Sequence, residues 1–279
     1  MSRSGSVRVA AATGIAALLA AGCVGSQHAG ATAGAASVTT PHQAILLAAS
    51  QSRRVNSLSM SLAMTISGSI GMTMRGTMSL QVHPTLLAEL NVSSMVSGGQ
   101  SVPGGMTEII GTKAFYLRMS VLSKEFGKAW LEVPYGDVDL GVDVASLLNQ
   151  MQNDSPVEQT QELAGAGDVR DLGSTTIDGT AVTEYSGTFS TNAGLAQLSA
   201  GERAASQQEF EQAGITSVDF NVWLDGQQQV KKITITGHGT KETVIVSELI
   251  TSINQPVSVQ FPPASQVATL PASDLGSGQ

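Results

Sequence analysis

The chain has 279 residues, with 22 acidic and 14 basic side chains and a net charge of −8. Nucleic-acid binding relies on a surplus of basic side chains that neutralise phosphates, so this balance argues against a nucleic-acid partner. Charged residues make up 13% of the chain, but hydrophobic residues reach 42%, so the low charge does not indicate disorder. A long apolar run occurs at the extreme N-terminus alone, which excludes a multi-pass membrane protein.

Residues 1–22 have the features of a bacterial export signal. Arg3 and Arg8 supply a positive start, and an apolar stretch follows from Val9 to Ala21. A membrane span needs about 20 apolar residues, so this shorter stretch is typical of a signal peptide. Removing the signal peptide deletes two arginines and no acid, which changes the net charge from −8 to −10.

Cys23 is the single cysteine of the chain, so no internal disulfide can form. The sequence before it, Leu19-Ala20-Ala21-Gly22, completes a stretch that resembles the lipobox of bacterial lipoproteins, although that motif more often has Leu where Ala20 stands. A thiolate is a strong nucleophile, suited to taking up a diacylglyceryl group as a thioether. We therefore predict covalent diacylglycerol on Cys23 and no other cofactor. Two acyl chains would hold the protein on the extracytoplasmic face of the cell membrane. The alternative is an ordinary secretory signal cut near Ala21.

The exported chain divides into three parts by composition. Residues 23–41 are mostly Gly, Ala, Ser and Thr without periodicity, which is typical of a flexible tether. Residues 263–279 are similar and are predicted to be a disordered tail. The folded domain is therefore predicted at 42–262, and it opens with a helix over 43–55, where apolar residues recur at helical spacing.

After this helix the apolar residues alternate with polar ones. Alternation predicts antiparallel strands with one apolar and one polar face. The first three strands are expected at 59–66, 72–82 and 86–92, and a loop at 97–105 follows. Later strands are expected at 107–110, 114–119, 129–133, 169–172, 176–190, 217–224, 229–236 and 240–250, with a short edge strand at 257–261.

Helices are predicted at 143–151, 156–163 and 193–212. The fold class is therefore α+β, with a curved antiparallel half-barrel sheet of about ten to eleven strands, since a sheet of that size tends to curl. The helices are expected to cover its concave face.

One face of the early strands is built from methionine and leucine. Methionine is unbranched and adapts to irregular partners, so this face is suited to holding acyl chains as well as to forming an ordinary core. Both readings stay open on the residues alone. The candidate lining residues are Met60, Leu62, Met64, Met72, Met74, Met78, Leu80, Val222 and Leu224.

Two segments of the second half resemble a known family. Residues 220–233 read FNVWLDGQQQVKKI, similar to the V-W-[LI]-D-x-x-G-x-[VP]-[RK]-[RK]-[VI] hairpin of the actinobacterial LppX/LprAFG lipoprotein family, in the LolA-like superfamily. Residues 167–188 resemble the G-D-V-x-x-x-G…V-D-G-x-x-T-x-x-Y-x-G-T segment of the same family. The likeness runs over most of residues 41–262. One departure is Gln227-Gln228-Gln229, where relatives often place Gly in the turn.

This resemblance implies a half-barrel with helices across its mouth and an apolar cavity inside. Family members with known roles bind lipids or lipoglycans and help to move them outward from the cytoplasmic membrane. We therefore expect a monomeric, membrane-anchored carrier of an acyl lipid or lipoglycan, working with an envelope transport partner. The alternative is an anchored interaction or sensor module with a packed core, no lipid ligand, and loops such as 97–105 contacting a partner.

Motifs for catalysis or metal binding are missing from the sequence. It has no G-x-S-x-G elbow, no P-loop and no dinucleotide fingerprint, so we do not expect an enzyme. The four histidines have no zinc spacing and are interpreted as surface residues. Asp137, Asp139 and Asp143 cluster, but they lack the ligand order of an EF-hand, and Asp143 is better explained as a helix N-cap.

Overall fold

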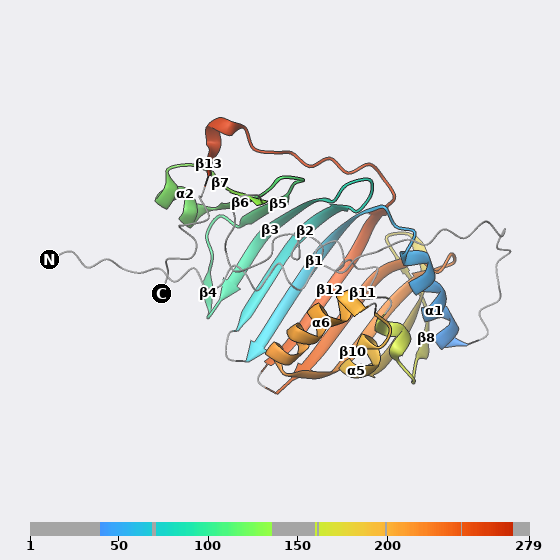
Figure 1. Ribbon diagram of the computed structural model, residues 1–279. Helices are drawn as coiled ribbons and strands as arrows, with labels where there is room; N and C mark the ends of the chain where they lie inside the picture. The colour runs from blue at the N-terminus through green and yellow to red at the C-terminus, as the bar shows by residue number, and fades with distance from the viewer. Residues whose placement is uncertain are drawn as a thin grey trace.

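The computed structural model describes residues 40–68, 71–135, 160, 162–198, 200–240 and 242–269 (Figure 1). The predicted signal peptide, Cys23, nearly all of the tether and the helix predicted at 143–151 lie outside these residues. Most of the helix predicted at 156–163 and the aspartates Asp137, Asp139 and Asp143 also lie outside them.

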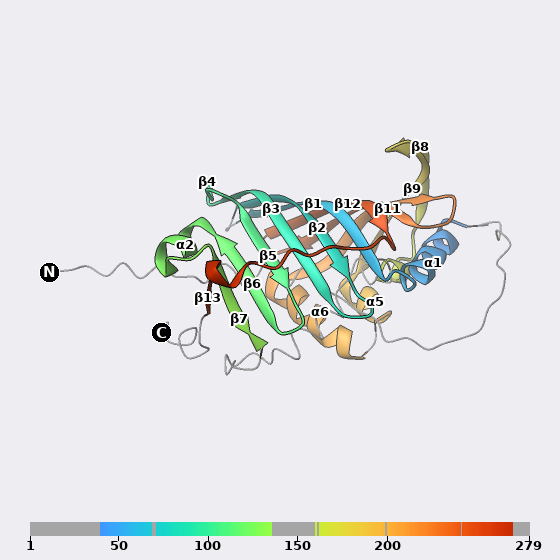
Figure 2. The same ribbon diagram turned by 90° about the horizontal axis from the view of Figure 1, so that it is seen from above.

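The described residues form one open, curved sheet of 13 strands (Figures 1 and 2). Its order is β13-β7-β6-β5-β3-β2-β1-β12-β11-β10-β9-β8, with β4 beside β3. The neighbours pair antiparallel except for β13 and β7, which pair parallel. The strands are β1 (Ser57–Gly68), β2 (Met72–Gln81), β3 (Leu87–Ser97), β4 (Gln100–Ser101), β5 (Met106–Ile110), β6 (Ala114–Met119), β7 (Trp130–Pro134), β8 (Arg170–Ile177), β9 (Thr180–Ser190), β10 (Ile215–Asp225), β11 (Val230–Gly239), β12 (Glu242–Ile253) and β13 (Val267–Thr269).

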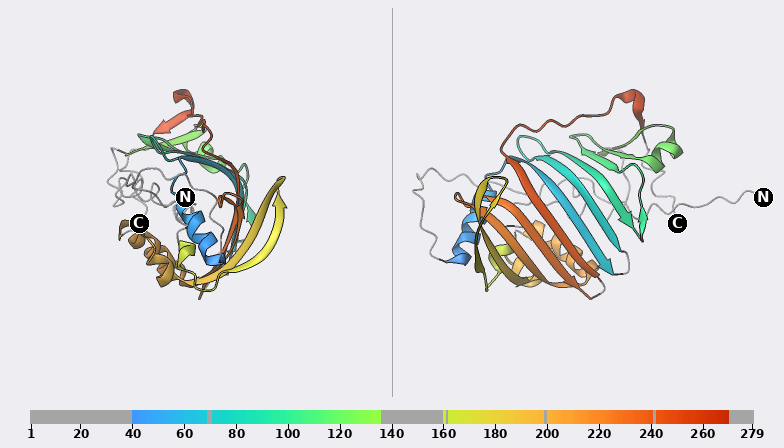
Figure 3. Two further views of the ribbon diagram at one scale, coloured as in Figure 1. Left: turned by 90° about the vertical axis from the view of Figure 1, so that its right-hand side faces the viewer. Right: turned by 180° about the vertical axis from the view of Figure 1, so that it is seen from behind.

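Short helices lie at one end of the concave side of this sheet (Figure 3). α5 and α6 contact β10, η3 contacts β9, and α1 contacts η3 and β8. Helical cover over the whole concave face stays a prediction. The helices are α1 (Pro41–Ser52), α2 (Ser120–Phe126), η3 (Leu163–Gly165), α5 (Thr191–Leu195), α6 (Ala200–Ala213) and η4 (Ala264–Gln266).

The first helix begins where the sequence places a cap and a proline. The Thr40 hydroxyl accepts a hydrogen bond from the Gln43 backbone N–H at 3.2 Å, and Pro41 occupies the first turn, where a missing N–H costs nothing. Ala44, Ile45 and Ala48 face the core. The predicted helix ran to residue 55, but the structure ends α1 at Ser52.

The strand count differs from the expected ten to eleven for local reasons. β4 has two residues and β13 has three, too short for alternation to reveal. The strand predicted at 176–190 is interrupted by a turn at Asp178 and Gly179, which have φ of 48° and 78° and connect β8 to β9. The helix predicted at 193–212 is divided into α5 and α6.

The C-terminal boundary also differs from the prediction. Residues 257–261 do not form the expected edge strand. Instead the chain continues into the predicted tail as η4 and β13, and Val267 pairs with Trp130 of β7. The folded part therefore reaches Thr269. Figure 2 shows the segment before β13 crossing the convex side of the sheet, where the Phe261 ring meets the Tyr116 ring edge-on at 5.8 Å.

Candidate functional site

The nine predicted lining residues lie on one face of the sheet. Residues directly opposite each other on paired strands share a face. Met60 is opposite Met78, and Met64 is opposite Met74. Val222 of β10 is placed on the same face through its cross-strand partners on β11 and β12. All nine side chains are buried and belong to one hydrophobic cluster.

This apolar face is the concave one. The cluster that contains the methionines also contains Ala44, Ile45 and Ala48 of α1, together with Leu163 of η3. Figure 3 shows these helices on the inner side of the curved sheet. The face therefore runs from β7 to β9 as a mainly apolar surface with the helices at one end.

One acidic side chain occupies a position in the middle of the apolar face. Glu248 of β12 is opposite Leu62 of β1 on one side and Ile233 of β11 on the other. Its side chain is fully buried, and neither carboxyl oxygen has a hydrogen-bond partner within the described part of the chain. Burial raises the pKa of Glu248 to about 7, because a charge is disfavoured away from water.

A second buried carboxyl lies on the same face. Glu108 of β5 is opposite Leu90 of β3 and Leu117 of β6, both of which are buried. Burial raises the pKa of Glu108 to about 7. The two glutamates are separated by four strand spacings, which is about 19 Å at about 4.8 Å per strand.

Neither glutamate was among the residues predicted from the sequence. The signal was present in the alternation itself. In β12, Val244, Val246 and Glu248 recur at every second position, so the glutamate stands in phase with the apolar residues. An acid in the buried phase of a strand therefore marks a site that a search for apolar residues passes over.

A groove of about 540 Å³ lies on the opposite, convex face. Its floor consists of small side chains such as Ser61, Ala63 and Thr77. At Gly76 the strands β2 and β3 come so close that a Cβ would collide with the Asn91 carbonyl oxygen. This polar groove is distinct from the predicted apolar cavity, because the side chains at its floor point to the other side of the sheet.

Two arginines line the convex groove. The Arg118 guanidinium donates to the Thr107 hydroxyl at 2.9 Å and lies over the Trp130 ring at 5.1 Å. The Thr107 hydroxyl in turn donates to the Asn91 side-chain oxygen at 3.1 Å. Neither Arg118 nor Arg75 forms an ion pair with a described carboxylate. The convex face is thus a polar, hydrogen-bonded surface.

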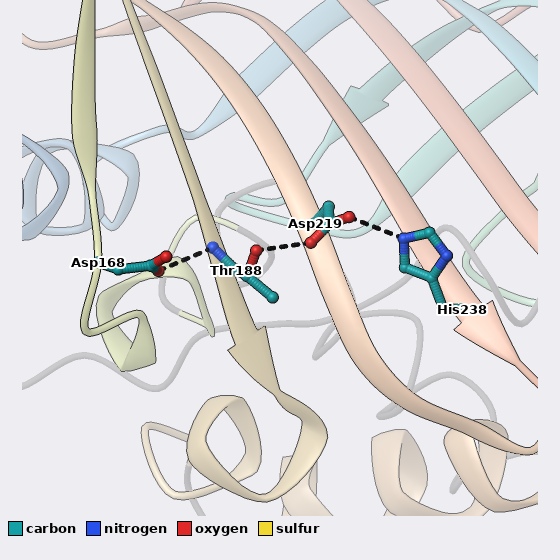
Figure 4. Close-up of polar contacts among 4 residues, drawn as sticks. All are labelled: Asp168, Thr188, Asp219 and His238. Atoms are coloured by element: carbon teal, nitrogen blue, oxygen red, sulfur yellow. Dashed lines mark hydrogen bonds and ion pairs between the residues drawn. The ribbon is translucent and has the colours of Figure 1, made fainter.

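A polar row near the β8–β11 end contains a hydroxyl, a carboxylate and an imidazole (Figure 4). The Thr188 hydroxyl donates to Asp219 at 2.6 Å, and His238 Nε2 lies 2.8 Å from the other Asp219 oxygen. These contacts, Thr188 first, hold the pKa of Asp219 below its usual range. Because the carboxylate separates the hydroxyl from the imidazole, the order is unlike a nucleophile–base–acid triad, in which the imidazole contacts the hydroxyl.

The described part of the chain contains neither a metal-binding cluster nor a membrane-spanning helix. In that part of the chain, no three or more His, Cys, Asp or Glu side chains gather into a metal-binding group. His42 instead contacts the Ala164 carbonyl oxygen at 3.2 Å. None of the helices in the same residues is both long and apolar enough to span a membrane.

Comparison with known sequences gives one partial relative. No protein-family model matches the chain. An uncharacterized 31.2 kDa protein from Streptomyces griseus is 32% identical over 117 residues. The match spans 40% of this chain and 38% of that protein.

Several solved structures are similar to the chain. The chain is similar to the lipoprotein LppX from Mycobacterium tuberculosis, with 15% identity and a TM-score of 0.48, over 80% of this chain and 100% of that one. It is also similar to LprF from Mycobacterium bovis, with 12% identity and a TM-score of 0.49, over 80% of this chain and 96% of that one. Both carry names of the family that two segments of the sequence resemble.

Proposed function

We propose that the chain is an exported lipoprotein, anchored through diacylglycerol on Cys23, that binds an acyl lipid or lipoglycan on its concave apolar face. In this role it carries the lipid within the cell envelope and makes or breaks no covalent bond. The nine lining residues named above form the floor of the binding surface.

Burial of acyl chains can supply the free energy that binding needs. Burying about 12 methylenes of one acyl chain, at about 0.8 kcal/mol each, contributes about 10 kcal/mol. Association costs about 4–15 kcal/mol in lost freedom, so a single chain binds marginally and two chains bind well. Methionine-rich walls suit this kind of ligand, because Met60, Met64, Met74 and Met78 can repack around chains of different length.

The observation that carries the proposal is the buried, unpartnered carboxyl of Glu248 on this face. A core that serves packing alone gains nothing from Glu248, because a buried carboxyl without partners costs stability. Its presence favours a surface that meets a ligand with polar groups over the packed core of an interaction or sensor module.

The experiment compares two tryptophan variants of the full chain. Met64→Trp fills space on the concave face, whereas Thr65→Trp adds the same ring at the neighbouring position of β1, on the convex face. We expect the wild type and Thr65→Trp to take up a fluorescent phospholipid from vesicles, and Met64→Trp to take up much less while keeping its circular-dichroism spectrum. Equal uptake by both variants, or none by the wild type, contradicts the proposal.

A further inference from the structure

Glu248 is surrounded by hydrocarbon on every neighbouring strand position that shares its face. Across the strands it meets Leu62 and Ile233, and along β12 its same-face neighbours are Val246 and Ile250. The nearest basic residue by sequence register, Lys232 of β11, is opposite Leu249 on the other face of the sheet, where its ammonium lies 4.3 Å from the centroid of the Trp223 ring. The ammonium of the next one, Lys231, lies 3.6 Å from the Asp225 carboxylate. No charged or polar group of β1 or β11 is therefore placed to satisfy the Glu248 carboxyl.

A leucine at this position would serve folding better. Replacing an unpartnered buried polar group by an apolar group of similar volume is neutral or stabilising, whereas keeping it costs its full desolvation. Buried polar groups without partners are rare in folded proteins, and each calls for an explanation. The simplest explanation is that the bound ligand brings the hydrogen-bond partner of the Glu248 carboxyl.

We propose that Glu248 is the hydrogen-bond partner of a hydroxyl group on the bound lipid, and so fixes the depth at which that lipid sits on the concave face. This inference rests on the proposed function, because it assumes that a lipid occupies the face. It adds a polar specificity residue to a surface that is otherwise apolar.

The chemistry of the neighbourhood selects a hydroxyl over charged groups. A phosphate or carboxylate would repel the glutamate when it is ionised and would share its desolvation cost. An ammonium has three donors, and among Leu62, Ile233, Val246 and Ile250 it would find acceptors only on Glu248. A hydroxyl has one donor, and it can also accept from the carboxyl when that group is protonated.

Two kinds of lipid carry such a hydroxyl, namely a diacylglycerol with a free glycerol hydroxyl and a glycolipid with sugar hydroxyls. Glu108 lies about 19 Å from Glu248 along the sheet, so one hydroxyl cannot contact both carboxyls. Glu108 is therefore the matched control, since it has comparable burial on the same face but a different position.

The test measures binding of two lipid pairs to the full chain. One pair is fluorescent diacylglycerol and its O-acetylated form, and the other is a fluorescent monoglycosyl diacylglycerol and its peracetylated form. The proteins are the wild type, Glu248→Leu and Glu108→Leu. A hydrogen bond to a charged or buried group predicts that acetylation weakens wild-type binding about tenfold in at least one pair.

The inference predicts that Glu248→Leu binds both members of that pair equally, while Glu108→Leu keeps the tenfold difference. The pair that shows the difference identifies the glycerol or the sugar hydroxyl as the source. A wild type that binds lipids but ignores acetylation overturns the inference and leaves the proposed function standing, as does a Glu248→Leu variant that still discriminates. A wild type that binds none of the four lipids overturns both.

Discussion

Glu248 of β12 lies directly opposite Leu62 of β1, so a carboxyl group occupies one position in a row of buried apolar side chains. The row continues across β11 to Ile233 and across β10 to Val222. This relationship links the stability of the fold to its proposed function, because the same residue destabilises the core and offers the ligand a polar contact.

Replacing Glu248 by leucine is expected to stabilise the protein in the absence of ligand. The carboxyl loses its hydration without gaining a partner, so its removal recovers on the order of 1–3 kcal/mol. Denaturant unfolding of the full chain measures the change in the free energy of unfolding, with the same dependence on denaturant concentration fitted for every variant. Ser247→Leu is the control, because it makes the same residue on the opposite face of β12. A Glu248→Leu variant less stable than wild type would contradict this expectation.

The two buried glutamates predict a particular pH dependence of stability. Their folded pKa is raised to about 7, above the ordinary value of 4.5, so the folded state holds protons that the unfolded state has released. The contribution is complete below pH 4.5, falls as the pH rises through 7, and is constant above that. The melting temperature should therefore decrease as the pH rises from 5 to 8.

The double variant Glu108→Gln, Glu248→Gln separates this effect from other titrations. Glutamine keeps the shape of the side chain but cannot titrate, so the decrease between pH 5 and pH 8 should largely disappear. Asp219 acts in the opposite direction, since its lowered pKa makes a contribution that is lost only as the solution becomes strongly acidic. A double variant with an unchanged pH profile would show that other groups cause it.

The hydrogen bonds that join Arg118, Thr107 and Asn91 on the convex face should contribute to stability. Thr107 accepts from Arg118 and donates to Asn91, and its side chain is buried, so Thr107→Val leaves both partners without it. We expect a loss of about 1–2 kcal/mol. Thr77→Val, at an exposed position of β2 on the same face, should change stability by less than about 0.5 kcal/mol. Thermal unfolding of both variants gives the comparison. Equal losses of stability in the two variants would contradict a stabilising role of the Thr107 hydrogen bonds.

The anchor is tested at Cys23. If the cysteine carries diacylglycerol, metabolic labelling with a palmitate analogue marks the wild type and leaves Cys23→Ala unmarked, with the variant shifted from the membrane to the soluble fraction. Unlabelled wild-type protein of the expected size would support the ordinary secretory signal instead. Ser26→Ala, three residues further on, controls for effects of substitution near the cleavage site.

The alternation within the strands was enough to place the nine predicted lining residues on one face, seven of them on β1 and β2 and two, Val222 and Leu224, on β10. A period of two keeps its phase as long as the register holds, and pairs such as Met60 with Met78 and Met64 with Met74 hold theirs. The same reasoning failed where tertiary contacts decide. The parallel pairing of Val267 with Trp130 joins residues distant in sequence through a strand of three residues, which local periodicity cannot reveal.

The candidate site was predicted only in part, and the cause differs from that of the missed strand. Apolar residues were taken as the signal for a lipid surface, so Glu108 and Glu248 were overlooked although both stand in the buried phase of their strands. The polar groove on the convex face was also not predicted, because it depends on the close approach of β2 and β3 at Gly76. Both features depend on which residues meet across strands.

Native mass spectrometry of the full chain, purified from membranes in mild detergent, tests the central claim most directly. The account predicts a discrete additional mass, beyond the covalent anchor, that corresponds to one lipid and disappears under denaturing conditions. Met64→Trp should show little of this mass, and Thr65→Trp should retain it. A wild-type protein that carries the anchor alone, and gains no mass after incubation with the lipid extract of its own membranes, would contradict the account.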